Sequence, residues 1–266
     1  MYIKYINLTV SDNIGGNLYR LIFEFHVRYL CNYFSKEIRK FKLLNGLRYD
    51  CLNIILDKDR YCRPSKEGTP WFNIEIGLPF SKDRYEKTKS TDNDSYYIEL
   101  LEQAFREFCS FSNVDYMCFQ KTFDKFENKN RKNEWLFKSL INTSLNIKAK
   151  FICKFSTNDF ELEAIFYDLQ STTLLCRGIC IRTKPDEIYF TGIFKSVVVN
   201  STHVIIVDNE NKPLILFPID KIKKRIFHYE FAESLYKDDE QANNTYKLII
   251  EELKYNGNID EYKIKD

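Results

Sequence analysis

The residues of this 266-residue chain that could do chemistry are three histidines, eight cysteines and a few carboxylates near the ends of expected strands. A Ser-His-Asp or Cys-His site would have to use His26, His203 or His228. His26 falls on an expected helix beside Glu24, but residues two apart on a helix do not share a face. No serine lies in a Gly-x-Ser-x-Gly elbow. We therefore assign no catalytic residue.

The cysteines and acidic residues form no metal-binding pattern. No two cysteines are spaced Cys-x-x-Cys, and the pair Cys176 and Cys180 has no second pair nearby. Asp57 and Asp59 lack the further acids and the glycine of a calcium-binding loop. No glycine-rich phosphate loop is present either. The sequence thus predicts no metal and no cofactor, and free rather than disulfide-bonded thiols.

The elements that must position these residues follow helical spacing in the first part of the chain. Apolar residues recur three and four apart over 17–44, which predicts a long helix. Segment 81–95 is charged and lacks apolar anchors, so we expect a loop there. The other expected elements are strands at 2–10, 49–57 and 71–78 and helices at 95–110, 114–127 and 135–145. This order indicates a mixed α+β domain of α/β type over residues 1–145.

After residue 146 the period changes from helical spacing to alternation, which predicts an antiparallel β domain over 146–266. We expect a first hairpin in which apolar side chains face apolar side chains across the two strands and lysines face acidic side chains. It pairs Cys153 with Phe160, Phe151 with Leu162, Ala149 with Ala164, Lys154 with Asp159 and Lys150 with Glu163. Further strands are expected at 172–182, 187–198, 202–208 and 213–219, and a helix at 242–255. The overall expectation is an α+β chain ending in a sandwich or barrel with a C-terminal helix.

The charges are nearly balanced overall but not along the chain. The formal net charge is +2, made of 25 basic and 19 acidic residues over 1–150 and 15 basic and 19 acidic residues over 151–266. This balance does not favour nucleic-acid binding, and the acidic second half favours a basic partner. No secretory signal and no apolar run of about 18 residues is present. We expect a cytoplasmic protein without a membrane partner.

Two alternatives remain open. A nucleic-acid-binding module could use Lys221–Arg225, a basic run followed by Phe227 and Tyr229. A hydrolase-like enzyme could have its site in the N-terminal half, where four candidate residues lie near the ends of expected elements. They are His26, Asp57, Asp59 and Glu75.

The combination of a well-packed chain, few catalytic candidates and acidic groups in one half resembles the bacterial immunity proteins that bind and neutralise a cognate toxin. The resemblance is carried by the acidic alternating strand Asp159–Glu163 and by the acidic groups that follow it. It implies a non-enzymatic protein with a protein partner, a toxin domain, whose association is accelerated by charge complementarity. The expected binding residues are Asp159, Glu161, Glu163, Asp186, Glu187, Asp238, Asp239 and Glu240, with Trp71 as an exposed anchor.

Overall fold

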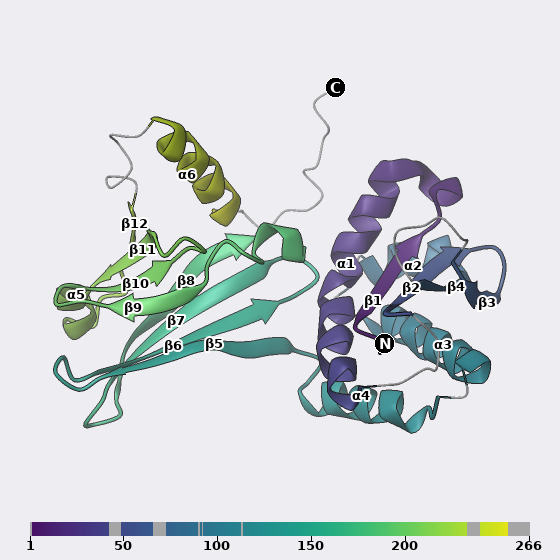
Figure 1. Ribbon diagram of the computed structural model, residues 1–266, viewed down its shortest axis with the longest axis horizontal. Helices are drawn as coiled ribbons and strands as arrows, with labels where there is room; N and C mark the ends of the chain where they lie inside the picture. The colour runs from purple at the N-terminus through teal and green to yellow at the C-terminus, as the bar shows by residue number, and fades with distance from the viewer. Residues whose placement is uncertain are drawn as a thin grey trace. The chain divides into compact units, whose positions relative to one another are not determined.

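The computed structural model describes residues 2–42, 49–65, 73–89, 91, 93–112, 114–232 and 240–254, with the side chains of 240–246 excepted. The chain divides into two compact units, Met1–Asn133 and Glu134–Asp266 (Figure 1). Helices and strands are present in both, so the expected α+β class is confirmed. The division falls after Asn133 rather than after residue 145, because the segment between them is a strand of the second unit.

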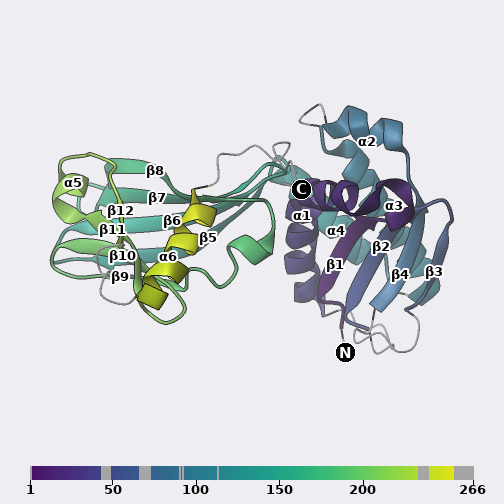
Figure 2. The same ribbon diagram turned by 90° about the horizontal axis from the view of Figure 1, so that it is seen from above.

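The first unit is built on a four-stranded sheet in the order β1-β2-β4-β3 (Figure 2). The strands are β1 (Tyr5–Val10), β2 (Cys51–Asp57), β3 (Tyr61–Pro64) and β4 (Asn73–Pro79). β1, β2 and β4 are parallel, and β3, which the sequence did not predict, pairs antiparallel with β4 at the edge. One sheet face is fully apolar and buried, because every second residue of the parallel strands is aliphatic.

The long helix α1 (Asp12–Phe41) lies against the free edge of β1. It starts five residues earlier than expected, because Gly16, at φ 76°, joins a first helical turn to the main helix. The left-handed backbone at that position favours glycine. Further along the helix, the Oγ atom of Ser35 accepts a hydrogen bond of 2.9 Å from the backbone N–H of Ile6. A helix side chain therefore accepts a hydrogen bond from a backbone N–H of the edge strand β1 that would otherwise have no partner in the sheet.

Three further helices complete the core of the first unit: α2 (Lys82–Lys89), α3 (Ser95–Ser112) and α4 (Met117–Asn128). The expectation of a loop over 81–95 is wrong, because α2 occupies most of that segment. Its single buried residue, Tyr85, packs within 5.2 Å of Phe23, measured between ring centroids. One large aromatic side chain thus anchors a helix that is otherwise polar, where the sequence offered no apolar stripe.

The second unit contains two four-stranded antiparallel sheets, β5-β6-β7-β8 and β12-β11-β10-β9. The first comprises β5 (Asn133–Asn142), β6 (Ile147–Phe155), β7 (Phe160–Asp168) and β8 (Leu174–Thr183). The second comprises β9 (Ser196–Val199), β10 (His203–Val207), β11 (Pro213–Pro218) and β12 (Glu230–Phe231). Aromatic rings fill the space between the sheets; Phe217 of β11, for example, lies 5.3 Å from Phe166 of β7. The unit is therefore a β-sandwich, one of the two architectures expected.

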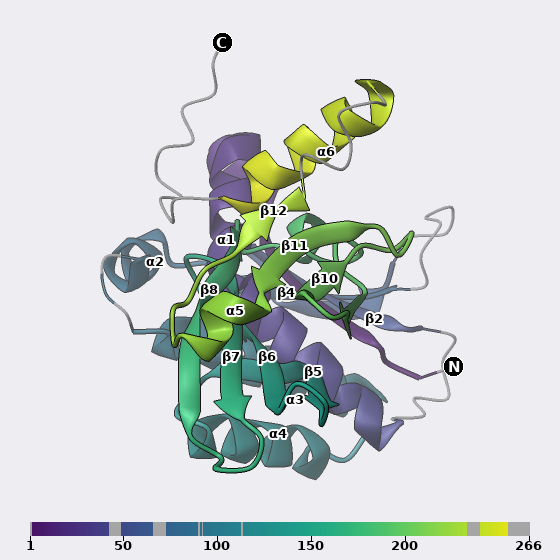
Figure 3. The same ribbon diagram turned by 90° about the vertical axis from the view of Figure 1, so that its left-hand side faces the viewer.

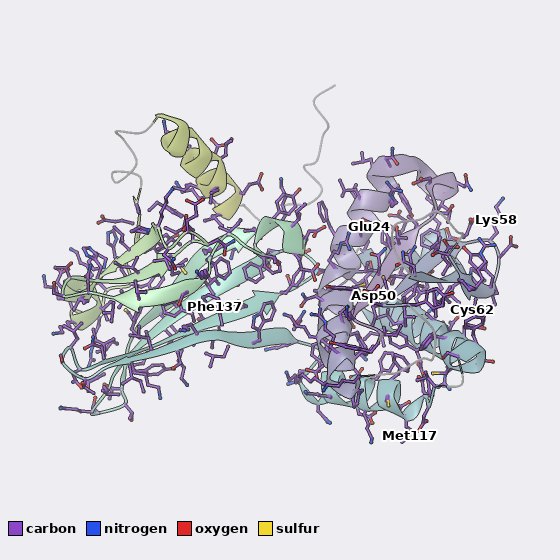
Figure 4. All side chains as sticks on the ribbon, viewed as in Figure 1. Glu24, Asp50, Lys58, Cys62, Met117 and Phe137 are labelled. Atoms are coloured by element: carbon purple, nitrogen blue, oxygen red, sulfur yellow. The ribbon has the colours of Figure 1, made fainter. Side chains whose placement is uncertain are left out.

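Two expected elements of this unit are wrong. Residues 135–145 form most of strand β5 and its turn rather than a helix, because Trp135 and Phe137 pack on Phe160 and Phe194 of the sandwich core (Figure 4). The expected strand 187–198 is a short 3-10 turn, Glu187–Tyr189, a loop and the four-residue strand β9. Gly192, at φ 93°, turns this loop.

The β6–β7 hairpin forms with the expected residues on each face but in a different register. Phe155 pairs with Phe160 and Cys153 with Leu162, so each expected partner is displaced by two residues. The turn causes the displacement, because the Oγ atom of Ser156 accepts hydrogen bonds from the backbone N–H groups of Asn158 and Asp159. These bonds fix a four-residue turn one position later than expected, and apolar and polar faces are unchanged because the displacement is even.

Two helices complete the unit. The short helix α5 (Ile219–Lys223) follows β11 (Figure 3), and α6 (Glu240–Leu253) contacts β8. Directly after α6, Lys254 forms an isolated backbone β-bridge with Arg182 of β8. Figures 1 and 3 place α6 beside the β9–β12 sheet, on the side away from β5 and β6. No described helix of this unit lies on the other broad side of the sandwich, which β5–β8 form.

Candidate functional site

The strongest candidate surface is the side of β6, β7 and β8 that points away from the sandwich core, which we call the outer face. The strand pairing arranges its side chains in four rows across the three strands. The rows are Lys154–Glu161–Arg182, Ile152–Glu163–Ile179, Lys150–Ile165–Arg177 and Lys148–Tyr167–Leu174. Three of the expected binding residues, Asp159, Glu161 and Glu163, lie on or beside this face, and the sheet brings them together.

Each of these three acids is ion-paired within the sheet. Glu163 is 5% exposed and bonds Lys154 Nζ at 3.0 Å and an Arg177 guanidinium nitrogen at 2.6 Å. Arg182 of β8 binds Glu161, with its Nε 3.0 Å from the carboxylate, and reaches Asp159 at 3.3 Å. The acidic strand is therefore neutralised by cations from its two neighbours.

Asp159 has an environment that disfavours its charge. Burial raises the pKa of this carboxyl above its ordinary value, and the nearby Glu161 adds to the rise. The hydroxyl of Ser156, which donates to Asp159 Oδ1 at 2.8 Å, and the guanidinium of Arg182 act in the opposite direction. Asp159 is thus a turn residue held by local contacts.

Within the described part of the chain, the cations at the opposite end of the outer face have no such partners. Neither Lys148 nor Lys150 has a carboxylate within ion-pairing distance among the residues that the structure describes. Lys150 Nζ lies 5.7 Å from the centroid of the Tyr167 ring, and Leu174 beside it is 46% exposed. This end of the face combines positive charge with exposed apolar surface.

The apolar part of the outer face is aliphatic. Ile152 and Ile179 are half-buried and flank Glu163, whereas Ile165, in the next row between Lys150 and Arg177, is buried at 6% exposure. On β5, Trp135 and Phe137 point into the core, so by alternation Leu136, which is 56% exposed, points to the outer side. The result is an aliphatic strip bordered by lysines and arginines.

The sequence contained a signal for this face that was not used. Lys148, Lys150 and Lys154 recur at even spacing along β6, so they must share one side of the strand. On the sequence alone, that pattern predicts only partners for the acids on β7. Alternation alone would put Arg177 and Arg182 on opposite sides of β8, because they are five residues apart, and the bulge between Ile179 and Ile181 brings them to the same side.

Of the remaining expected binding residues, the structure describes the side chains of Asp186 and Glu187, and neither belongs to the four rows of the outer face. Asp186 caps the 3-10 turn, accepting a hydrogen bond of 3.1 Å from the backbone N–H of Ile188, and Glu187 is half-buried in that turn. Glu240 begins α6, but its side chain lies outside the described part of the structure. Trp71, Asp238 and Asp239 also lie outside the described residues.

The candidate residues of an N-terminal enzyme are separated by the fold. His26 Nδ1 lies 3.0 Å from the hydroxyl of Tyr85 in the helical core. Glu75 lies on the opposite face of the sheet, paired with Arg63 at 3.3 Å. Asp57 accepts a hydrogen bond from the backbone N–H of Lys58 at the end of β2 (Figure 4). The sheet thus lies between the histidine and Glu75.

The other two histidines have local partners, and two of the thiols, those of Cys51 and Cys176, are disfavoured as nucleophiles by burial. His203 contacts the hydroxyl of Thr202 at 2.9 Å, and His228 lies 3.2 Å from Glu230. Burial raises the pKa of Cys51 to about 12 and that of Cys176 to about 11. A thiol with a raised pKa is a poor nucleophile at neutral pH.

The basic run Lys221–Arg225 forms part of α5 and the turn that follows it. Its neighbouring aromatic residues are packed inward: the Phe227 ring covers Gly178 and lies 6.2 Å from Phe217. Lys224 pairs with Asp220 at 3.5 Å. The run therefore presents charge without the exposed aromatic rings that base stacking requires.

No family model matches the chain, and no curated protein or solved structure is detectably similar to it. Within the described residues, no three His, Cys, Asp or Glu side chains are grouped so that they could hold a metal ion. None of the described helices combines the length and apolar character needed to cross a membrane.

Proposed function

We propose that this chain is a non-enzymatic binding protein, and specifically an immunity protein that neutralises a toxin by binding it through the outer face of β6–β8. The observation that carries the proposal is the face itself: an aliphatic strip, exposed at Leu174, with charged residues on both sides. Protein interfaces have this composition, with an apolar centre and a polar rim.

The scaffold supports such a role. The outer face lies on paired strands of one sheet, and Glu163 with its two cationic partners ties β6, β7 and β8 together through side chains. A surface on paired strands loses little conformational freedom when it binds, which favours affinity. The titratable residues that an enzyme would need are instead engaged in structural contacts, such as His26 with Tyr85.

The test is co-expression of the full chain with the product of the neighbouring gene. The proposal predicts that the gene product alone arrests growth, that the chain restores growth, and that the two purify as a stoichiometric complex. A neighbouring product that is toxic but is neither bound nor neutralised would refute the proposal.

A matched pair of variants assigns the rescue to the face. Leu174→Asp places a charge within the exposed apolar part of the outer face, whereas Leu248→Asp does the same on α6, where Leu248 is 66% exposed. We expect the first variant to lose rescue and the second to retain it, with melting temperatures of both close to that of the unmodified chain. Equal rescue by both variants would place the interface elsewhere.

A further inference from the structure

We infer, on the basis of the proposed function, that the partner surface which docks on the outer face is acidic with an apolar centre, opposite in charge to the partner expected from the acidic second half of the sequence. The sign of the charge on a folded face depends on which strands are adjacent, and here two basic strands flank the acidic one.

The numbers of basic and acidic side chains on the outer face determine the sign of its net charge. Its four rows contain five cations, Lys148, Lys150, Lys154, Arg177 and Arg182, against the two carboxylates of β7. Adding Asp159 at the turn still leaves the cations in excess.

The excess positive charge is also unevenly distributed over the outer face. Asp159, Glu161 and Glu163 all lie toward the β6–β7 turn, where Arg182 and Arg177 bind them. Lys148 and Lys150 lie at the far end, without a carboxylate partner among the described residues. A partner therefore meets a neutral ion-paired end and a positive end, so carboxylates on the partner are favoured opposite the lysines.

The apolar residues of the face favour a protein over a nucleic acid. A single-stranded nucleic acid binds to basic surfaces whose aromatic rings stack on its bases. The four rows contain one aromatic residue, Tyr167, and Lys150 already lies over its ring. Ile152, which is half-buried, and Leu174, which is 46% exposed, cannot stack on bases, but they can bury aliphatic side chains of a protein.

The test compares two probes with the full chain at low ionic strength by fluorescence anisotropy. The first is an amphipathic peptide of alternating Leu and Glu, and the second is a mixed-sequence single-stranded RNA of the same formal charge. We expect the peptide to bind more tightly, and its affinity to fall as salt is added. Tighter binding of the RNA, or absence of peptide binding, would overturn the inference.

Charge reversal locates the peptide on the face. Lys148→Glu with Lys150→Glu changes the charge of the chain by the same amount as Lys223→Glu with Lys247→Glu, whose side chains are exposed on α5 and α6. The first pair is expected to weaken peptide binding about tenfold or more, and the second to change it much less. Equal effects of the two pairs would mean that only the total charge matters, which would refute a docking site at Lys148 and Lys150.

The same variants separate this inference from the proposed function. If the cognate partner is found, its association rate should fall with the first pair of reversals and should lose most of its salt dependence. Rescue that survives this reversal overturns the acidic-partner inference and leaves the immunity function standing. Peptide binding at the face together with a failure of rescue overturns the immunity function and leaves the acidic docking surface standing.

Discussion

The substitution Ser35→Ala tests how the first unit protects the open edge of its sheet. β1 is an edge strand, and the backbone N–H of Ile6 is satisfied by the Ser35 hydroxyl of α1 at 2.9 Å. Both residues are buried, so water cannot replace the lost hydroxyl. The substitution therefore leaves a buried donor without an acceptor.

The magnitude follows from that orphaned donor. An unsatisfied buried N–H costs about 1–3 kcal/mol, whereas alanine in place of serine recovers up to about 0.5 kcal/mol of helix propensity. We expect the free energy of unfolding of the first unit to fall by about 1–2 kcal/mol, which corresponds to a fall in its melting temperature of about 3–8 °C. Amide hydrogen exchange, read at Ile6, should be faster than in the unmodified chain.

Ser112→Ala is the matched control, because it makes the same change on a helix of the same unit. Ser112 Oγ donates to the carbonyl of Phe108 within its own helix at 2.7 Å, so its loss orphans no donor. We expect a change within about 0.5 kcal/mol. If Ser35→Ala lowers the free energy of unfolding no more than Ser112→Ala does, and the amide exchange rate of Ile6 is unchanged, the Ser35 hydroxyl does not stabilise the edge of the sheet.

Three further predictions concern Asp159 and Gly178 of the second unit and the thiol of Cys51. Burial raises the pKa of Asp159, so the stability that this carboxyl contributes is present below its unperturbed pKa of 3.8 and is lost as the pH rises through its pKa in the folded chain. The Asp159→Asn variant should therefore be at least as stable as the unmodified chain at pH 7. A lower melting temperature of the variant at that pH would contradict this. Gly178→Ala places a methyl group into the Phe227 ring, so we expect the free energy of unfolding, measured with denaturant, to fall by about 1–3 kcal/mol. Adding Phe227→Leu should recover part of that stability. If the losses of the two substitutions simply add, the clash is excluded. The pKa of about 12 at Cys51 leaves only about 1 in 10⁴ of its thiol ionised at pH 8. Site-resolved alkylation should label it slowly until the chain is unfolded, and labelling at the rate of a free cysteine would contradict its burial.

The hairpin of β6 and β7 illustrates which part of a sheet can be predicted from sequence. Alternation assigns each side chain to a face, and the assignment is correct over 147–154 of β6 and over 160–166 of β7. The register depends on the turn, and the hydroxyl of Ser156 fixes it through two backbone donors. Cross-strand charge matching was a weaker guide, because Lys154 reaches diagonally to Glu163 instead of pairing with Asp159.

The misassigned elements have a common cause in tertiary packing. α2 has one buried side chain, Tyr85, so no amphipathic stripe identifies it in the sequence. In β5, Trp135 and Phe137 contact rings of the sandwich that lie far along the chain, and these contacts select a strand over the expected helix. Local spacing could not decide either case, because the deciding contacts are with residues distant in sequence.

The outer face shows why the charge of a chain segment does not predict the charge of a surface. The stretch Asp159–Glu163 is acidic along the sequence, and β7 alone would present that charge. In the sheet, β7 lies between β6 and β8, and Arg177 and Arg182 of β8 are 14 and 21 residues from the acids that they bind. The strands' order thus turns an acidic segment into the middle of a basic face, and it is the charge of the face, not of the segment, that a partner of this surface would meet.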